Sequence, residues 1–155
     1  MKYLILENIR SAYNVGAIFR TADAVGVSKI FLIGYTPTPI DRFGRIQSEI
    51  KKTSLGASQE ILWEHATDVA VIVQTLQFDG VSVVAVEQGE DSVSLSDFQV
   101  PKNVAYVMGN EVGGVSKEVL NLADIIMEIP MLGTKESLNV SVAAGIVLYH
   151  GLVTT

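Results

Sequence analysis

The stretch Val104-Ala-Tyr-Val-Met108-Gly-Asn-Glu-Val-Gly-Gly114 decides the fold, because an unbroken apolar run passes directly into a glycine-rich turn. An apolar run without polar alternation is typical of a strand that is buried on both faces of a parallel sheet. Glycines directly after such a strand indicate a tight turn whose backbone can approach another group closely. Comparable runs occur at Tyr3–Leu6, Lys29–Ile33, Glu60–Trp63, Val81–Val86 and Asp124–Ile129.

Segments with helical character separate these runs. They cover residues 14–25, 46–55, 66–78, 117–122 and 140–153, and we expect Asn14 to cap the first and Gly26 to end it. Strands that alternate with helices predict an α/β protein with a mostly parallel sheet and helices on both faces. A chain of 155 residues suffices for one core, so we expect a single domain spanning residues 1–155. Ligands bind beyond the carboxyl ends of such strands, so we expect the ligand site at the turns after Met108 and Ile129.

The composition excludes several kinds of site. The chain has no cysteine, which rules out disulfides and zinc–thiolate centres and fits the reducing cytoplasm, where we expect the protein to lie. The amino-terminal apolar run is too short for a signal peptide, and Val140–Val153 is too short for a membrane span. His65 and His150 lack metal-ligand spacing, so no metal is expected, and Trp63 is expected in the core.

Charge is distributed unevenly, although its net value is −6. Residues 1–52 hold eight of the eleven basic side chains and four of the seventeen acidic ones, a local balance of +4, whereas the remainder carries −10. Phosphate contacts depend on lysine and arginine, so a globally acidic chain disfavours a polyanionic partner. The basic first third nevertheless gives the protein one face that can attract phosphate, unless the clustering is a chance feature of the surface.

Three polar segments carry candidate chemistry, although each alone has an ordinary explanation as a helix cap, a tight turn or a surface charge. The second segment is neither a P-loop nor a dinucleotide-binding turn, because it lacks the P-loop lysine and the G-x-G-x-x-G pattern. Its Glu111 disfavours a pyrophosphate and could instead accept hydrogen bonds from a ribose or an amino group. The segments are Asn14-Val-Gly16-Ala-Ile-Phe-Arg20, Gly109-Asn-Glu111-Val-Gly-Gly114-Val-Ser116, and Ile129-Pro-Met131-Leu-Gly133 followed by Ser137-Leu138-Asn139-Val-Ser141.

Together, in order and spacing, the three segments resemble the three motifs of the SpoU (TrmH-type) branch of the SPOUT RNA methyltransferases. The resemblance covers nearly the whole chain. It implies transfer of a methyl group from S-adenosyl-L-methionine to the ribose 2′-hydroxyl of an RNA, by a homodimer whose carboxyl-terminal segment forms a deep trefoil knot. Pattern rules alone would stop at a doubly wound α/β sheet, because knots are so rare.

The resemblance also implies roles for individual residues. Arg20 would be the main catalytic residue, binding the phosphate beside the target ribose and stabilising the developing oxyanion. A guanidinium stays protonated in proteins and is a poor general base, so that phosphate or a small neutral fraction of Arg20 would take the proton. The other catalytic residues would be Asn14, Glu111, Ser137 and Asn139, and the cofactor would be held by Gly109, Ile129, Met131, Ser137 and Leu138.

Substrate recognition is expected from the domain itself, because the chain shows neither the extra RNA-binding domain nor the basic extensions of many family members. We expect RNA to contact the loop from Tyr35 to Gly44 and neighbouring basic side chains, with transfer RNA favoured over ribosomal RNA. Three alternatives remain open: methylation of a base, a non-catalytic RNA-binding module, and a metabolic nucleotide-binding enzyme. The candidate RNA-binding residues are Arg10, Arg20, Arg42 and Arg45.

Overall fold

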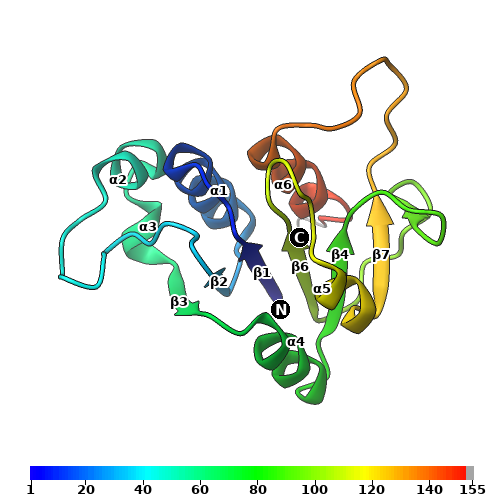
Figure 1. Ribbon diagram of the computed structural model, residues 1–155, viewed down its shortest axis with the longest axis horizontal. Helices are drawn as coiled ribbons and strands as arrows, with labels where there is room; N and C mark the ends of the chain where they lie inside the picture. The colour runs from blue at the N-terminus through cyan, green and yellow to red at the C-terminus, as the bar shows by residue number, and fades with distance from the viewer. Residues whose placement is uncertain (153–155) are drawn as a thin grey trace.

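The computed structural model describes residues 1–152 and has seven strands in one sheet, with helices on both faces (Figure 1). The strand order is β3-β2-β1-β6-β4-β7-β5, and every pairing between these described strands is parallel. The expected α/β class with a mostly parallel sheet is confirmed. The strands are β1 (Lys2–Glu7), β2 (Lys29–Ile33), β3 (Leu62–Ala66), β4 (Ser82–Val86), β5 (Val93–Ser94), β6 (Val104–Met108) and β7 (Ile125–Glu128).

Alternate residues of the central strands face two separate cores. Leu4 and Leu6 of β1 belong to one core and Ile5 between them belongs to the other, as the two-residue period of a strand requires. The first core is covered by α1 (Ala12–Val25), α2 (Ser48–Ser54), α3 (Ala57–Glu60) and α6 (Val140–Tyr149). The second is covered by α4 (Val69–Phe78) and α5 (Lys117–Leu122).

Strand β6 lies at the centre of the sheet, between β1 and β4, and all five of its residues are buried. Tyr106 in its middle is fully buried and meets Phe98 edge to face, with the ring centroids 6.4 Å apart. Its hydroxyl has no hydrogen-bond partner among the described protein groups, and burial raises the pKa of Tyr106 to about 12. Because the strands are parallel, the turn after β6 opens beside the carboxyl ends of β1 and β4.

The first helix begins earlier than the sequence predicts. Ser11, not Asn14, is the cap, since its hydroxyl accepts a hydrogen bond from the Asn14 amide nitrogen at 3.1 Å. Asn14 thus lies in the first turn of α1, buried, with its side chain available for other partners. Gly26 ends the helix in the left-handed region with φ 73°, as expected.

Gly16 allows α1 and α2 to lie close together. A Cβ at Gly16 would overlap the Thr53 hydroxyl and lie 2.9 Å from the Ile50 carbonyl oxygen. Any larger residue would therefore push the two helices apart.

Strands β2 and β6 and helix α5 have the expected bounds, and each of the remaining predicted elements differs by a few residues at one or both ends. Residues 57–60 form the short helix α3, so β3 starts at Leu62 rather than at Glu60, and the two-residue strand β5 was missed. Helix α4 starts at Val69 instead of Ala66, because Asp68 caps it by accepting from the amides of residues 70 and 71. The last helix ends at Tyr149, and Val153 lies outside the described residues. Within residues 1–152, no helix combines the length and hydropathy needed to cross a membrane.

Candidate functional site

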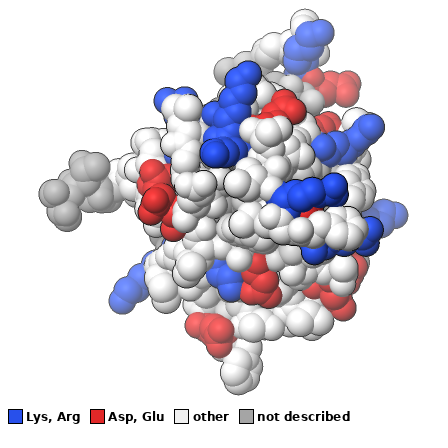
Figure 2. Space-filling model, turned by 90° about the vertical axis from the view of Figure 1, so that its left-hand side faces the viewer, with Lys and Arg blue, Asp and Glu red and all other residues white. Residues whose placement is uncertain are grey.

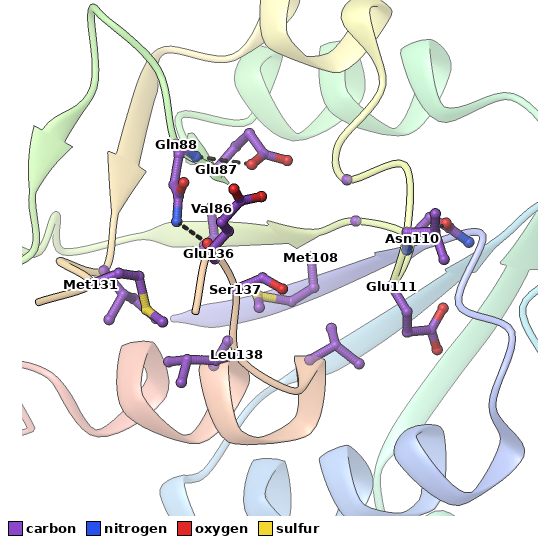
Figure 3. A pocket seen from close by; sticks show the side chains of 16 residues that line it. Val86, Glu87, Gln88, Met108, Asn110, Glu111, Met131, Glu136, Ser137 and Leu138 are labelled. Atoms are coloured by element: carbon purple, nitrogen blue, oxygen red, sulfur yellow. Dashed lines mark hydrogen bonds between the residues drawn. The ribbon is translucent and has the colours of Figure 1, made fainter. Parts of the chain in front are cut away.

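A cavity of about 320 Å³ opens where β4, β6 and β7 end (Figure 3). Its floor includes the last residues of β4 and β6, Val86 and Met108, and its sides are two loops that follow β6 and β7. This is the edge of the sheet at which parallel α/β proteins bind ligands. The cavity is lined by all five residues expected to hold a cofactor, which are Gly109, Ile129, Met131, Ser137 and Leu138.

The turn after β6 is held closed by its own backbone. Asn110 and Gly114 exchange two hydrogen bonds, 2.9 and 3.1 Å long, and Gly114 has a φ of 71°. A Cβ at Gly109 would overlap the Val115 amide nitrogen, so a glycine is needed here by the turn itself. The turn is therefore a rigid support that fixes the position of Glu111.

Glu111 binds the amino-terminal end of the first polar segment. Its carboxylate accepts hydrogen bonds from the Arg10 amide at 3.0 Å, the Ser11 amide at 3.2 Å and the Asn14 side-chain amide at 3.4 Å. Burial, the largest single effect, raises the pKa of Glu111, but these donors and its own backbone amide together lower it below its ordinary value. Glu111 is thus an ionised carboxylate that is held in place by donors from the first polar segment.

Asn14 joins Glu111 to the third polar segment. Its Oδ1 accepts a hydrogen bond of 3.2 Å from Asn139 Nδ2, while its own Nδ2 donates to Glu111. Asn139 in turn caps α6, because its Oδ1 accepts from the backbone amide of Ser141 at 2.9 Å. Each amide oxygen faces a donor and each amide nitrogen faces an acceptor, so the orientation of both side chains is fixed. Three distant parts of the sequence meet at the rim of the cavity.

Glu87 and Gln88 also line the cavity, and sequence reasoning missed both. One Glu87 oxygen accepts from the Val115 amide at 2.9 Å, which ties the end of β4 to the turn after β6. Gln88 donates from its side chain to the Glu136 carbonyl oxygen at 2.6 Å and so holds the loop that follows β7 (Figure 3). Their place immediately after the buried strand at 82–86 is the signal that could have identified them.

Arg20 does not lie at this cavity. Its exposed side chain lies on another side of α1, where it lines a separate hollow with Tyr13, Lys52 and Tyr149. The spacing of residues 14 and 20 along a helix accounts for this separation, because six residues correspond to about 240° of rotation. Within one chain, the structure therefore brings Asn14, Glu111 and Asn139 together and leaves Arg20 apart.

The other basic residues expected to contact RNA are distributed differently. Arg10 is exposed beside the cavity, and its backbone amide binds Glu111. Arg42 and Arg45 lie in the loop between β2 and α2, which borders a second cavity. Figure 2 views the side of the molecule that carries the loop between β2 and α2. Blue lysine and arginine side chains are spread over this side, with red acidic side chains between them.

The two histidines have structural hydrogen bonds. His65 Nε2 lies 2.8 Å from the Gly34 carbonyl oxygen, and His150 Nε2 lies 3.1 Å from that of Phe98. Within residues 1–152, no three histidine, aspartate or glutamate side chains converge in a way that could hold a metal ion.

The fold and this cavity define a class, which is a parallel α/β domain with a small-ligand site at the carboxyl ends of its central strands. Residues 1–149 match the model of the SpoU rRNA Methylase family. The chain belongs to this family, which confirms the resemblance seen in the three polar segments.

Individual relatives agree with the family assignment. The 23S rRNA (guanosine-2'-O-)-methyltransferase RlmB of Neisseria meningitidis serogroup B is 34% identical over 145 residues, which cover 94% of this chain and 55% of that protein. An AdoMet-bound rRNA methyltransferase from Sinorhizobium meliloti has a TM-score of 0.86 at 32% identity, covering 96% of this chain and 54% of the other. The TrmH/SpoU tRNA modifying enzyme of A. aeolicus has a TM-score of 0.84 at 30% identity, with 96% and 72% covered. The chain thus spans little more than half the length of its curated relative.

Proposed function

We propose that this chain transfers a methyl group from S-adenosyl-L-methionine to a ribose 2′-hydroxyl of an RNA. The observation that carries the proposal is the hydrogen-bonded group of Asn14, Glu111 and Asn139 at the rim of a cavity. The same cavity is lined by every residue that the family resemblance assigns to the cofactor.

The cavity suits this cofactor chemically. Met108, Met131 and Leu138 offer apolar surface for a planar base, while the backbone of the Gly109 turn offers hydrogen-bonding groups. Glu87 and Glu111 place two carboxylates on the lining, and their charge favours a sulfonium cation. When bound, S-adenosyl-L-methionine supplies the methyl group, and the task of the protein is to position it against the ribose oxygen.

Asn14, Asn139 and Ser137 are proposed to orient the ribose beside the cavity. Asn14 and Asn139 are already fixed by their mutual hydrogen bond, so they require little ordering when the substrate arrives. Ser137 lines the cavity from the loop after β7 and adds a hydroxyl that can donate or accept. Glu111 acts indirectly, by holding Asn14 and the segment before α1.

Arg20 can join this site only from a second copy of the chain, and we propose a homodimer for that reason. The exposed apolar side chains of α1 and α6 support this proposal, since Tyr13 is 57% exposed, Val142 51% and Tyr149 51%. Burial of such a surface between two copies would account for a helix, α6, that is apolar all round. In the dimer, Arg20 would bind the phosphate next to the target ribose and stabilise the developing oxyanion.

The trefoil knot remains part of the proposal. Strand β7 lies beyond β4 in the sheet, whereas α6 packs against α1, and residues of the segment 129–138 line a cavity together with the last residues of β4 and β6. We propose that the carboxyl-terminal segment is threaded at this edge of the sheet to form the knot.

For the substrate, we propose ribosomal RNA instead of the transfer RNA that the sequence favoured. The relative with 34% identity is named for 23S rRNA and for a guanosine ribose, whereas the enzyme named for transfer RNA is 30% identical. A guanosine ribose in ribosomal RNA is therefore the proposed target, and the cytoplasm is the proposed location, because this is where such RNA is modified.

Two measurements test the proposal. The purified protein is incubated with ribosomal RNA or transfer RNA and a methyl-labelled cofactor, and the digested RNA is analysed by nucleoside mass spectrometry. We expect 2′-O-methylguanosine from ribosomal RNA, while a methylated base would favour the base-modifying alternative. Calorimetry with the cofactor alone is the second measurement, and no binding at about 100 μM would favour the non-catalytic RNA-binding module.

A further inference from the structure

A second cavity of about 700 Å³ lies between the end of β3 and the loop that joins β2 to α2. The cofactor chemistry does not use it. We propose that this cavity binds an unpaired nucleobase of the substrate RNA, from a nucleotide that flanks the methylated one. The inference rests on the proposed RNA methyltransferase function and adds a recognition site to it. The residues that carry it are Tyr35, Arg42, Arg45, Trp63 and His65.

The walls of the cavity are aromatic. Tyr35 is 61% exposed, and Trp63, which was expected in the core, packs against the core and also lines the cavity. Aromatic side chains that are accessible but anchored offer stacking surfaces for bases, and this is the common way in which proteins bind single-stranded RNA.

His65 adds a hydrogen-bond acceptor to the cavity. Its Nε2 must donate to the Gly34 carbonyl oxygen at 2.8 Å, because a carbonyl oxygen has only lone pairs to offer. In the neutral ring, Nδ1 is then left as an acceptor that can receive a hydrogen bond from the amino group of a base.

The loop on the other side is a small rigid hairpin. Ile40 and Ile46 form an antiparallel bridge across it. Asp41 closes the tip by accepting from the Phe43 amide at 2.8 Å, the Arg45 amide at 2.9 Å and Arg45 Nε at 2.8 Å. The Arg45 backbone amide is the main cause that lowers the pKa of Asp41, so the closing carboxylate stays charged.

The hairpin presents a cationic aromatic tip. The guanidinium carbons of Arg42 and Arg45 lie 4.8 and 5.0 Å from the centre of the exposed Phe43 ring. Asp41 neutralises Arg45, whereas Arg42 has no ion-pair partner among the described residues and can bind a phosphate. The tip can thus hold the backbone of a nucleotide whose base enters the cavity.

Tyr35 connects this cavity to the cofactor cavity. Its hydroxyl accepts a hydrogen bond of 2.9 Å from Asn110, which lines the cofactor cavity in the turn after β6. Asn110 also donates to the Asn8 carbonyl oxygen at 2.8 Å, and Asn8 accepts from the Tyr35 amide at 3.2 Å. The two cavities therefore share a wall, which is the arrangement needed for neighbouring nucleotides of one strand.

The test measures RNA binding without cofactor, so that it does not depend on methyl transfer. The probe is a fluorescent single-stranded RNA that carries the modified region of the ribosomal RNA, titrated at several salt concentrations. Tyr35→Ala is expected to weaken binding by about 5- to 150-fold, the effect of losing one stacked base, without changing the salt slope. Arg42→Ala should reduce the salt slope by about one.

Two controls make the result specific. Tyr35→Phe keeps the ring and should bind RNA like the unaltered protein. Phe78→Ala removes a ring that is 92% exposed on α4, on the opposite face of the sheet, and should have no effect. Folding is checked by circular dichroism and by urea denaturation.

Unchanged RNA affinity in a folded Tyr35→Ala protein would overturn the inference, as would failure of the unaltered protein to bind the RNA. Loss of methyl transfer with intact Tyr35-dependent RNA binding would count against the proposed function instead. The two failures are therefore distinguishable.

Discussion

Asn139 donates a hydrogen bond from its side-chain amide to Asn14 Oδ1 at 3.2 Å, linking residues that are 125 positions apart in the sequence. The same side chain caps α6 through its Oδ1. One residue therefore both starts the last helix and orients a residue on the first, and substitutions can separate these two roles.

Asn139→Asp should retain the cap and lose the link. A carboxylate still accepts a hydrogen bond from the Ser141 amide. It cannot donate one to Asn14 Oδ1, and its negatively charged oxygen repels that amide oxygen. We expect near-normal stability and strongly reduced methyl transfer. Asn139→Ala should lose both roles, with a cost of about 1 kcal/mol in the free energy of unfolding. Urea denaturation measures the stability of both variants, and single-turnover kinetics measures their rate of methyl transfer. Equal stability of the Ala and Asp variants would contradict the capping role.

Glu111→Gln should weaken the docking of the segment before α1 in a pH-dependent way. The pKa of Glu111 is lowered in the folded protein from 4.5, so its contribution is present above that value and is lost as the pH falls through the lowered pKa. Because the carboxylate is only partly buried, we expect a difference of about 1 kcal/mol at pH 7 that shrinks once the pH falls below 4.5 toward the lowered pKa. Denaturation of both proteins across this range provides the measurement, and a difference independent of pH would argue against the ionised contact.

Gly16→Ala should destabilise the protein by about 1–2 kcal/mol, despite the better helix propensity of alanine. The added methyl group would meet the Thr53 hydroxyl and the Ile50 carbonyl oxygen of α2, and the latter cannot move without the helix. Gly145→Ala in α6 is the matched comparison, because its Cβ would make an ordinary 3.9 Å contact with Thr21 Cγ2. This variant should be as stable as the parent or more so in thermal denaturation, and similar losses in both variants would exclude the proposed packing effect.

Mixing two inactive variants should restore activity if Arg20 serves the site of another copy. A protein carrying Arg20→Ala retains Asn139, and one carrying Asn139→Asp retains Arg20, so a mixed dimer contains one complete site. Random exchange would give about a quarter of normal activity. Lack of recovery after verified subunit exchange would place Arg20 outside the reaction or within its own subunit.

Tyr106→Phe should leave the protein as stable as before or raise its free energy of unfolding by up to about 1 kcal/mol. The phenol hydroxyl is buried without a protein partner among the described residues, and its removal takes away the cost of desolvating it. A clear fall in the melting temperature would show that the hydroxyl is satisfied in solution.

The parallel sheet could be predicted because its strands are continuous apolar runs, and strand β6 has the predicted bounds, Val104–Met108. The cap of α1 could not be predicted, because Ser11 and Asn14 are equally good capping residues. Only the packed structure shows that the Ser11 side chain accepts the capping hydrogen bond. The edge of the sheet that carries the cavity was also predictable, because the turns after Met108 and Ile129 follow strands, whereas the residues assigned to the cofactor came from the family resemblance. Glu87 and Gln88 were missed because their partners, Val115 and the Glu136 carbonyl, are distant in sequence.

Glu111 is held chiefly by main-chain amides, those of Arg10 and Ser11, rather than by the Arg10 side chain. Backbone amides are present whatever residue occupies a position, proline excepted. Position 10 can therefore change its charge or size during evolution without disturbing the anchoring of the site. A surface residue next to the cavity is in this way free to change, so related domains could differ at this position and still keep the same hydrogen-bonded support for Glu111.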